Sequence, residues 1–341
     1  MAILASLLAA LLLGSAHAAP VDELGHWLEH VPVVATPAAE RGGYHSAREV
    51  YEALYLAARA NPGRVAVERI GTTHSGTPIW AFHITNPATP GVERKVLIFA
   101  GLHAMEWIGT ETALATALEF ITHPPDHTLI TVVPIANPDG RGKVEADLLA
   151  GENTWRRGNR INVDLNRDFA VNRDSDAVWA HVPIAKRYYY TSPGPLSQPE
   201  SRALDALAAR ERYDRSASLH AYGGFFYYPW AGRFARPDDR YDFERLGRAM
   251  EGAQGGHAYN TKQLGRWLFA FRALGTEIDH LYGEYGTRAF LIELTRTGIS
   301  PLKPWEWKDR FQRYNPEDRE EHVERGWRAL RALVLTDLEP A

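Results

Sequence analysis

Two side chains just beyond an apolar run have the types and spacing to bind one metal ion. His103 and Glu106 lie three residues apart and follow the apolar residues 96–100 and a glycine, Gly101. His220 ends another apolar run far downstream and could complete the set. Two histidines and one glutamate leave a position on zinc open for water, which catalysis requires. A His-x-x-Glu spacing often arises by chance, so a strand-end histidine beside a surface glutamate is the alternative.

Glu293 is a glutamate inside an apolar run, residues 290–294. A carboxylate in such a place is costly unless it faces water, a metal ion or a partner. Desolvation raises the pKa of a carboxylate towards the range that suits a general base. The alternative is a glutamate on the solvent side of an edge strand. No alternating polar residues surround Glu293, so we favour a functional role.

Basic and amide side chains gather between these regions. Arg157 is one of the arginines in the stretch 156–160, and Asn166 and Arg167 are adjacent. Guanidinium groups bind carboxylates through paired hydrogen bonds, so this set could bind an anionic group of a ligand. A solvated basic face is the alternative, and we expect it for the other arginines of the stretch.

Residue patterns predict the elements that must position these side chains. Apolar runs typical of strands covered on both faces lie at residues 95–100, 129–135, 216–219 and 288–294. A strand pair, 65–70 and 78–84, flanks Ser75-Gly76, and helices are expected at 46–61, at 110–121 and from Asn315 to about Leu335. Asn137-Pro138-Asp139-Gly140 has the composition of a turn.

Strands that alternate with helices predict a single three-layer α/β/α domain. Its central sheet should be mixed, mostly parallel and twisted, with about eight strands and helices on both faces. Functional sites in such sheets lie beyond the carboxyl ends of the strands, where His103 and His220 fall. The sequence has no internal repeat, low-complexity tract or long linker, which favours one domain.

Composition limits the possible partners. The chain has 341 residues, a net charge of −4 and no cysteine. This charge gives no reason to expect nucleic acid or an anionic membrane as a partner. Without cysteine the chain forms no disulfide, no thiolate metal site and no cysteine-linked lipid anchor.

The first residues predict export. Residues 3–13 form an apolar stretch too short to span a bilayer comfortably, and residues 16–18 fit a small-x-small cleavage site. A buried N-terminal helix is the alternative, because no Lys or Arg precedes the stretch. We therefore expect a signal peptide at residues 1–18, a surface segment at 19–43, and a folded domain at 44–341 that is secreted or periplasmic.

Six motifs occur in a fixed order along the chain. They are His103-x-x-Glu106, Asn137-Pro138-Asp139-Gly140, Val163-Asp164-Leu165-Asn166-Arg167, Gly194-Pro195-Leu196-Ser197-Gln198-Pro199-Glu200, Leu219-His220-Ala221-Tyr222 and Ile292-Glu293-Leu294. Together they resemble the zinc metallocarboxypeptidases of the carboxypeptidase A/B type, also called funnelins. The likeness extends from about residue 44 to the C-terminus. Residues 44–341 are therefore expected to be a zinc carboxypeptidase catalytic domain.

The resemblance implies one Zn²⁺ per chain and a role for each candidate residue. His103, Glu106 and His220 would hold the zinc ion, and Glu293 would be the general base. The substrate would be a peptide with a free C-terminal carboxylate.

The resemblance also implies the residues that bind this substrate. Asn166 and Arg167 would bind the terminal carboxylate, and Arg157 would stabilise the oxyanion of the scissile carbonyl. We choose Arg157 over Arg156 because the residues that follow Arg157 better match the family's Arg-x-Asn-Arg pattern. Asp279, fourteen residues before Glu293, has the spacing that the family expects.

The chain departs from the family pattern at the substrate pocket. Phe271 occupies the position of the family's mobile tyrosine and cannot donate a hydroxyl hydrogen bond, so we expect substrate binding that is either weaker or supported by Tyr222 or Tyr282 instead. Ile278 occupies the position of the pocket-floor residue and predicts a preference for apolar C-terminal side chains. The neighbouring Glu277 could instead attract Lys or Arg, which is the alternative.

Two other functions are compatible with the sequence. The short span from Trp155 to Asn166 is similar to that of bacterial relatives that cleave γ-glutamyl-diaminopimelyl bonds in cell-wall peptides. A zinc-dependent binding protein without catalysis is the other alternative, although such proteins usually lack a metal ligand or the base.

Overall fold

A computed structural model describes residues 21–31, 42–153, 156–174, 192–255, 259–267, 272–296, 302 and 308–338. The strands are β1 (Val65–Thr72), β2 (Pro78–Ile84), β3 (Arg94–Ala100), β4 (Thr128–Val133), β5 (Arg215–Ala221), β6 (Phe225–Tyr228), β7 (Asn260–Gln263) and β8 (Arg288–Leu294). The helices are α2 (Ala47–Ala60), α3 (Trp107–Thr122), α4 (Pro138–Leu149), α6 (Pro199–Glu211), α7 (Arg240–Ala253), α8 (Leu264–Trp267), α9 (Glu277–Tyr285), α10 (Arg310–Tyr314) and α11 (Arg319–Leu335), with a 3₁₀ turn η2 (Leu165–Arg167).

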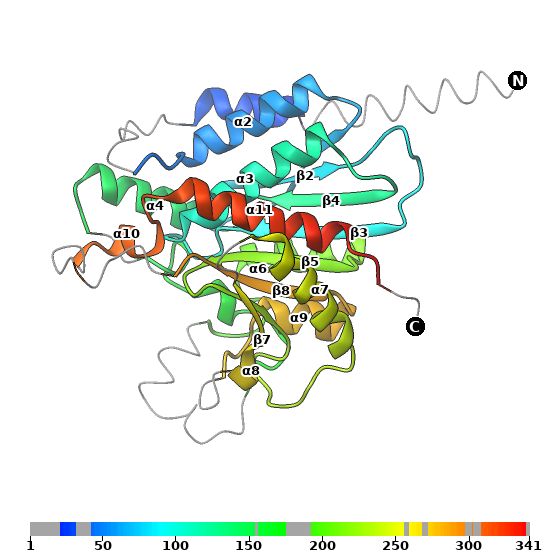
Figure 1. The fold of residues 1–341 in the computed structure, drawn as a ribbon. Coiled ribbons are helices and arrows are strands. Elements are labelled where there is room, and N and C mark those ends of the chain that lie inside the picture. Colours follow the sequence, from blue (N-terminus) through cyan, green and yellow to red (C-terminus); the bar gives the residue numbers. More distant parts are fainter. Residues whose placement is uncertain are drawn as a thin grey trace, which may run out of the picture.

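The strands form one mixed sheet in the order β1-β2-β4-β3-β5-β8-β6-β7 (Figure 1). β3 pairs in parallel with β4 and β5, β5 pairs in parallel with β8, and β6 pairs in parallel with β7. The other neighbouring pairs are antiparallel. The prediction of a mixed, mostly parallel sheet is confirmed, and the carboxyl ends of β3, β5 and β8 meet at one edge.

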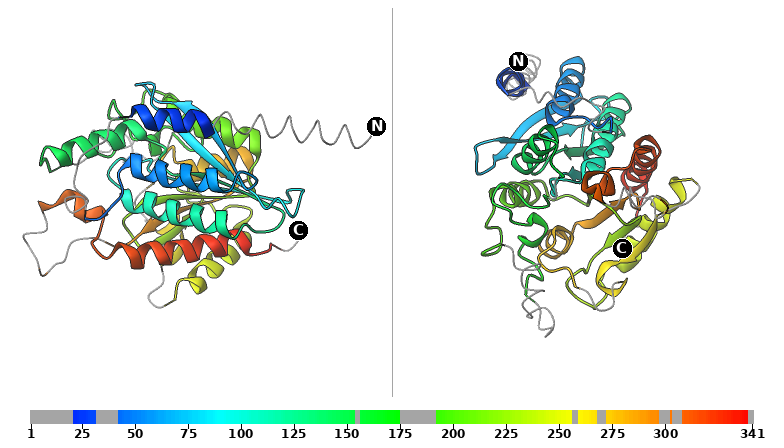
Figure 2. Two further views of the ribbon diagram at one scale, coloured as in Figure 1. Left: turned by 90° about the horizontal axis from the view of Figure 1, so that it is seen from above. Right: turned by 90° about the vertical axis from the view of Figure 1, so that its left-hand side faces the viewer.

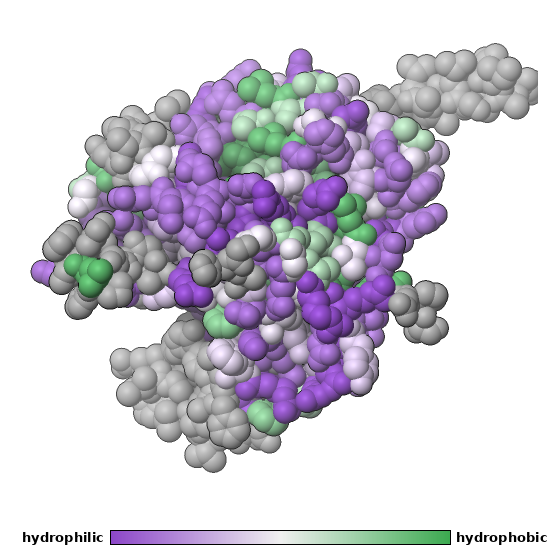
Figure 3. All heavy atoms as spheres, in the orientation of Figure 1, coloured by the Kyte–Doolittle hydropathy of each residue, from purple (hydrophilic) through white to green (hydrophobic). Residues whose placement is uncertain are grey.

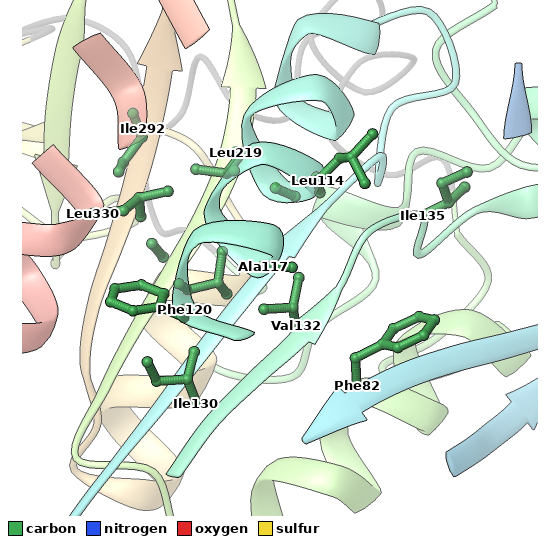
Figure 4. Close-up of a cluster of buried hydrophobic side chains, with 14 of the residues drawn as sticks. Phe82, Leu114, Ala117, Phe120, Ile130, Val132, Ile135, Leu219, Ile292 and Leu330 are labelled. Carbon is green, nitrogen blue, oxygen red and sulfur yellow. The ribbon is translucent and has the colours of Figure 1, made fainter. Parts of the chain in front are cut away.

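Alternate side chains of the central strands enter two different cores, as the two-residue period of a strand requires. Val96 and Ile98 of β3 face one core, whereas Leu97 and Phe99 face the other. In the first core, Leu114, Ala117 and Phe120 of α3 meet apolar side chains of β4, β5, β8 and α11 (Figure 4). These strands are therefore buried on both faces, which explains their continuous apolar runs.

Helices cover both faces of the sheet and complete the three predicted layers. α2, α3 and α11 lie side by side over one face (Figure 2), and α7 packs beside α11. α6 and α9 contact each other and cover the opposite face. Because α3 lies between the sheet and two neighbouring helices, it is buried almost all round, which accounts for its weak amphipathic pattern.

Part of the predicted surface segment at 19–43 is helical. Residues 21–30 form a helix in which Leu24 and Leu28 are buried, and the ring of Trp27 meets that of Tyr51 edge-on at 5.4 Å. The predicted signal peptide at 1–18 lies outside the described residues.

The surface seen in Figure 3 is largely hydrophilic, with apolar residues gathered in small groups. Within the described ranges, no helix combines the length and the apolar character needed to cross a bilayer.

Two local predictions were wrong, and both concern an asparagine followed by proline. Asn137 does not begin an isolated turn: it is the N-cap of α4, and its side chain accepts a hydrogen bond from the backbone of Gly140. Asn315 does not begin the last helix: it follows α10, and α11 starts only after Asp318. In both cases the composition indicates a change of chain direction. Tertiary contacts decide whether a helix begins or ends there.

Candidate metal centre

A short loop carries His103 and Glu106 from the end of β3 to the start of α3. The loop begins at Gly101, whose φ of +68° suits glycine. A side chain there would press on Ile135, because an added Cβ would lie 3.3 Å from its Cα. Glu106 is the N-cap residue of α3, yet its side chain makes no capping hydrogen bond. The carboxylate of Glu106 is therefore free to face the site.

The three predicted ligands converge. His103 Nδ1 lies 2.9 Å from both carboxylate oxygens of Glu106 and 3.0 Å from His220 Nδ1. His220 Nδ1 is in turn 3.0 Å from Glu106 Oε2. All three side chains are almost fully buried. Their candidate ligand atoms lie within 4.8 Å of one another, which is close enough for one metal ion to bind all three.

The donor set itself fits a zinc ion. Asp164 Oδ1 lies 3.2 Å from His103 Nε2, so this nitrogen carries the proton and Nδ1 offers its lone pair. Although burial raises the pKa of Asp164, Arg157 and His103 hold it well below its usual value, so Asp164 is ionised. Two nitrogen lone pairs and a carboxylate facing one point would repel each other without a cation between them. A zinc ion bound between them would remove this repulsion.

His220 and Glu293 are neighbours across the sheet. They are register partners on the parallel strands β5 and β8. Because Leu219 and Ile292 face the core beneath α3, the side chains of His220 and Glu293 point to the opposite face, towards α9. The strand register therefore brings the predicted general base next to a predicted metal ligand.

Glu293 lies in an environment that favours its neutral form. Burial, together with the nearby charge of Glu106, raises the pKa of Glu293 to about 8. Its Oε2 is buried and has no hydrogen-bond partner among the residues that the structure describes. Gly223 lies against this side chain, because a Cβ added to the glycine would be 3.0 Å from Glu293 Cβ. Glu293 is thus a confined carboxyl group that points towards a cavity.

Arg157 is tied to the metal-ligand loop. Its Nε donates to Asp164 Oδ2 at 2.7 Å, and its Nη1 lies 3.5 Å from Glu106 Oε1. Its carbonyl accepts a hydrogen bond from the backbone of Ala104. Arg157 also lines the cavity described below, and Arg156 does not.

A cavity of about 260 Å³ unites the candidate residues. Its lining includes two of the predicted metal ligands, His103 and His220, and the candidate base Glu293. It also includes Arg157, the predicted oxyanion stabiliser, and the predicted substrate-binding residues Asn166, Arg167 and Tyr222. The remaining wall is formed by Gly223, Tyr227, Leu264, Ala273, Thr276 and Leu291.

Some predicted residues lie elsewhere. Ile278 is fully buried on α9 and is not one of the cavity-lining residues, although it packs in the same apolar cluster as Leu264 and Leu291. Tyr282 packs against Trp230, 4.9 Å between ring centroids, and does not line the cavity. Phe271 lies outside the described residues.

Glu277 cannot serve as a pocket charge in this arrangement. Its side chain has no exposed surface, and it accepts a hydrogen bond from Ser218 on the neighbouring strand. It is not one of the residues that line the cavity. The structure therefore does not support the alternative in which Glu277 attracts a C-terminal Lys or Arg of the substrate.

Two residues with no predicted part in the site hold it together. Asp164 orients His103, and its place in the Asp-Leu-Asn-Arg motif was the available signal. Asn315 accepts hydrogen bonds from the backbone of Trp107 and Ile108, at 2.7 and 3.1 Å, and so caps α3 from a distant part of the chain. No local pattern could have indicated this contact, which spans more than 200 residues.

Known carboxypeptidases are similar to this chain in sequence. Carboxypeptidase A2 of Mus musculus is 26% identical over 275 residues, which cover 75% of this chain and 64% of that protein. A protein of Saccharomyces cerevisiae described as inactive metallocarboxypeptidase ECM14 is 24% identical over 285 residues, again with 75% and 64% covered. The chain thus spans just under two thirds of the length of these relatives.

Solved structures show the same fold. Bovine thrombin-activatable fibrinolysis inhibitor, in complex with tick carboxypeptidase inhibitor, superimposes with a TM-score of 0.70 at 19% identity, covering 86% of this chain and 97% of that one. The sequence family is recognised over most of the chain, because residues 50–320 match the family described as zinc carboxypeptidase. With this match and the buried His-Glu-His set in place, the chain belongs to the zinc carboxypeptidase family.

Proposed function

We propose that this protein is a zinc-dependent carboxypeptidase that removes C-terminal residues from peptides. One observation carries the proposal: His103, Glu106 and His220 converge at a cavity that also holds Glu293 and Arg167. A metal site, a carboxyl group and a cation that can bind an anion are the parts that C-terminal peptide hydrolysis requires.

Glu293 is the proposed general base. A bound zinc ion supplies Lewis acidity and lowers the pKa of a coordinated water. Ionised Glu293 accepts the proton of the attacking water at a carboxylate oxygen and then returns it to the leaving amine.

Arg157 is the proposed stabiliser of the oxyanion. Its guanidinium is held by Asp164 through Nε, at 2.7 Å, while the side chain remains about one third exposed towards the cavity. A fixed cation beside the reacting carbonyl lowers the energy of the tetrahedral oxyanion without reorganising during the reaction.

Asn166 and Arg167 are proposed to bind the terminal carboxylate. Both line the cavity. The side-chain oxygen of Asn166 accepts a hydrogen bond from the backbone of Glu277 at 3.0 Å, which fixes the amide so that its NH₂ group remains to donate. A cation at this position favours binding of peptides with a free C-terminal carboxylate, which makes the protein an exopeptidase.

The preferred C-terminal side chain is proposed to be apolar. Tyr227, Leu264 and Leu291 line the cavity, and Ile278 supports their cluster from behind. Because the carboxylate of Glu277 is occupied by Ser218 and fully buried, no described carboxylate other than Glu293 remains on the cavity wall to attract Lys or Arg.

The proposal is tested with a panel of small peptides, with and without a zinc chelator. Peptides ending in Phe should be hydrolysed faster than matched peptides ending in Arg, chelation should abolish both rates, and C-terminal amidation should raise KM steeply. Faster cleavage of the Arg peptide would overturn the side-chain preference, and unchanged kinetics on amidation would overturn the role of Arg167.

Two alternatives are separated by the same panel. Hydrolysis of a murein tripeptide but not of ordinary peptides would select the cell-wall peptidase. Stoichiometric zinc with no hydrolysis of any peptide would select a zinc-dependent binding protein, a possibility that a relative described as inactive makes concrete. The presence of all three ligands and of Glu293 favours catalysis over that alternative.

We also propose that the protein is exported. The support is the apolar stretch and cleavage pattern of residues 1–18, from which a mature chain would begin near Ala19. N-terminal sequencing of the protein secreted by an expressing host tests this, and a start at Met1 would contradict it.

A further inference from the structure

Glu277 is a carboxylate with no exposed surface at the first position of α9. A buried carboxylate is costly unless specific partners satisfy it. Its Oε1 accepts a hydrogen bond from Ser218 Oγ and lies 3.5 Å from His220 Nε2. The positive end of the helix dipole at the start of α9 also favours a negative charge at this position. Glu277 is therefore placed behind a metal ligand.

The orientation of His220 explains how its contact with Glu277 could affect metal binding. His220 Nδ1 faces His103 and Glu106, so Nε2 must carry the proton when Nδ1 binds a metal. His220 Nε2 and Glu277 Oε2 are both buried, and neither has a hydrogen-bond partner in the described part of the chain. A small rotation of either side chain would pair them. This is the arrangement in which a carboxylate fixes the tautomer of a metal-binding histidine.

The backbone of Glu277 is also connected to the part of the site that contains His103. Its N–H donates to Asn166 Oδ1 at 3.0 Å, and the N–H of Asn166 donates to Asp164 Oδ1 at 2.9 Å. Asp164 in turn orients His103. A hydrogen-bonded path therefore runs from the backbone of Glu277 through Asn166 and Asp164 to His103, while the Glu277 carboxylate lies 3.5 Å from His220 Nε2.

We propose that Glu277 is a positioning residue that holds His220 in its metal-binding tautomer and orientation. The inference rests on the proposed function only in taking zinc as the bound metal. It assigns to Glu277 the part that Asp164 plays for His103, and it excludes a direct contact between Glu277 and substrate.

The test compares zinc affinity, measured by chelator competition, in Glu277→Ala, Glu277→Gln and the parent protein. The dissociation constant for zinc should rise on the order of 10- to 100-fold in Glu277→Ala. It should rise less in Glu277→Gln, because an amide oxygen can still accept from Nε2 without the charge. Glu284→Gln, an exposed change on the same helix, is the matched control and should bind zinc normally.

A purely structural role for Glu277 predicts a different result. Both variants would then unfold at lower temperature without zinc, yet their zinc affinity would equal that of the parent, and this would overturn the proposal. The isosteric Gln variant keeps the volume of the buried side chain, so it tests the proposal even if the Ala variant fails to fold. Since no peptidase assay is involved, a failure of the proposed function would show up separately.

A second metal site is indicated by an independent observation on the helix of residues 21–30. His26, Glu29 and His30 are exposed and project from one turn, with candidate ligand atoms within 4.8 Å of one another. The imidazole centroids of His26 and His30 are 4.3 Å apart. His30 Nδ1 donates to the carbonyl of His26 at 2.7 Å, which leaves the lone pair on Nε2 for a metal.

We infer that these three side chains form a peripheral site for a divalent cation such as Zn²⁺. Two imidazoles and one carboxylate suit zinc. Zinc bound there would join His26 to His30 across one helical turn and so stabilise the N-terminal helix. The site is far weaker than the buried one, because its side chains are not held in place beforehand.

Equilibrium dialysis of the zinc-loaded protein against increasing free zinc tests this site. The parent should bind a second equivalent, His30→Ala should lose it while keeping the first, and His123→Ala should behave like the parent. His123 is a suitable control because it is an exposed histidine paired with a glutamate one turn away. Binding of a single equivalent by the parent, or retention of the second by His30→Ala, would overturn the inference.

Discussion

At the scale of single residues, the ionisation of Glu293 should determine how activity falls at acidic pH. The residue acts as a base only when ionised, so activity rises as pH rises through its pKa. Burial raises that pKa from 4.5 towards 8, and a bound cation opposes the shift by favouring the carboxylate. We therefore expect kcat/KM to fall on acidification with a midpoint between these values. Zinc content is measured at each pH, and a midpoint below 4.5 with zinc retained would contradict the assignment.

Arg157 and Arg156 provide a matched pair of substitutions. Arg157→Ala should lower kcat by about 10²- to 10³-fold, because it removes the cation beside the developing oxyanion. Arg156→Ala should leave kcat nearly unchanged, since Arg156 does not line the cavity. Steady-state kinetics on one peptide compares the two, and the opposite order of effects would assign the oxyanion role to Arg156.

Residue pattern together with the family resemblance predicted the candidate ligands, but not the residues that support them. His103, Glu106, His220 and Glu293 could be selected because each follows or interrupts an apolar strand at the edge where sites form. The alternative of a pocket charge on Glu277 stayed open because a sequence does not show which way the first residue of a helix points. Its burial behind His220 depends on how α9 packs against β5.

At the scale of elements, Asn315 should stabilise α3. Its side-chain oxygen accepts from two backbone N–H groups at the helix start, and its Nδ2 donates to the carbonyl of Met105 at 2.8 Å. Asn315→Ala would leave buried N–H groups without an acceptor, which costs about 1–3 kcal/mol. Asn315→Asp keeps the acceptor and should cost less.

Urea unfolding of the zinc-free protein measures both Asn315 variants. Zinc-free protein is used so that a change in metal affinity does not enter the comparison. Equal stability of the parent and Asn315→Ala would show that water satisfies the start of α3 and that Asn315 is not its cap.

The strands were predictable because burial on both faces leaves a local signature. The apolar runs that became β3, β4, β5 and β8 were correctly assigned, with ends shifted by a few residues. The short strands β6 and β7 were not predicted, because four residues at the side of a sheet carry too little pattern. Whether an Asn-Pro pair begins a helix or follows one depends on contacts elsewhere in the chain, as Asn137 and Asn315 show.

At the scale of the whole molecule, the metal should bind two distant parts of the chain together. His103 and Glu106 lie between β3 and α3, whereas His220 lies on β5, more than 100 residues later. A ligand that binds only the folded state stabilises it in proportion to the logarithm of its free concentration. We therefore expect zinc to raise Tm and a chelator to lower it.

Thermal unfolding across a range of buffered zinc concentrations measures this effect. His220→Ala removes one of the three ligands, so its Tm should depend much less on zinc. A parent Tm that does not change on chelation would mean that the buried set holds no metal in the folded protein.

Much of the overall architecture followed from the order of strands and helices, since alternating elements leave few ways to cover a sheet on both faces. The cavity that unites Glu293, Arg157 and Arg167 could be expected only through the family resemblance, because these residues come from separate segments. The helix at residues 21–30 had no prediction of its own.

The most direct test of the account is the substitution Glu293→Gln, measured for both zinc content and peptide hydrolysis. Glutamine keeps the shape of the side chain but cannot accept the proton of the attacking water. The account predicts one buried zinc ion per chain, as in the parent, with kcat reduced by about 10²- to 10⁴-fold. Near-normal hydrolysis by the zinc-loaded variant would contradict it.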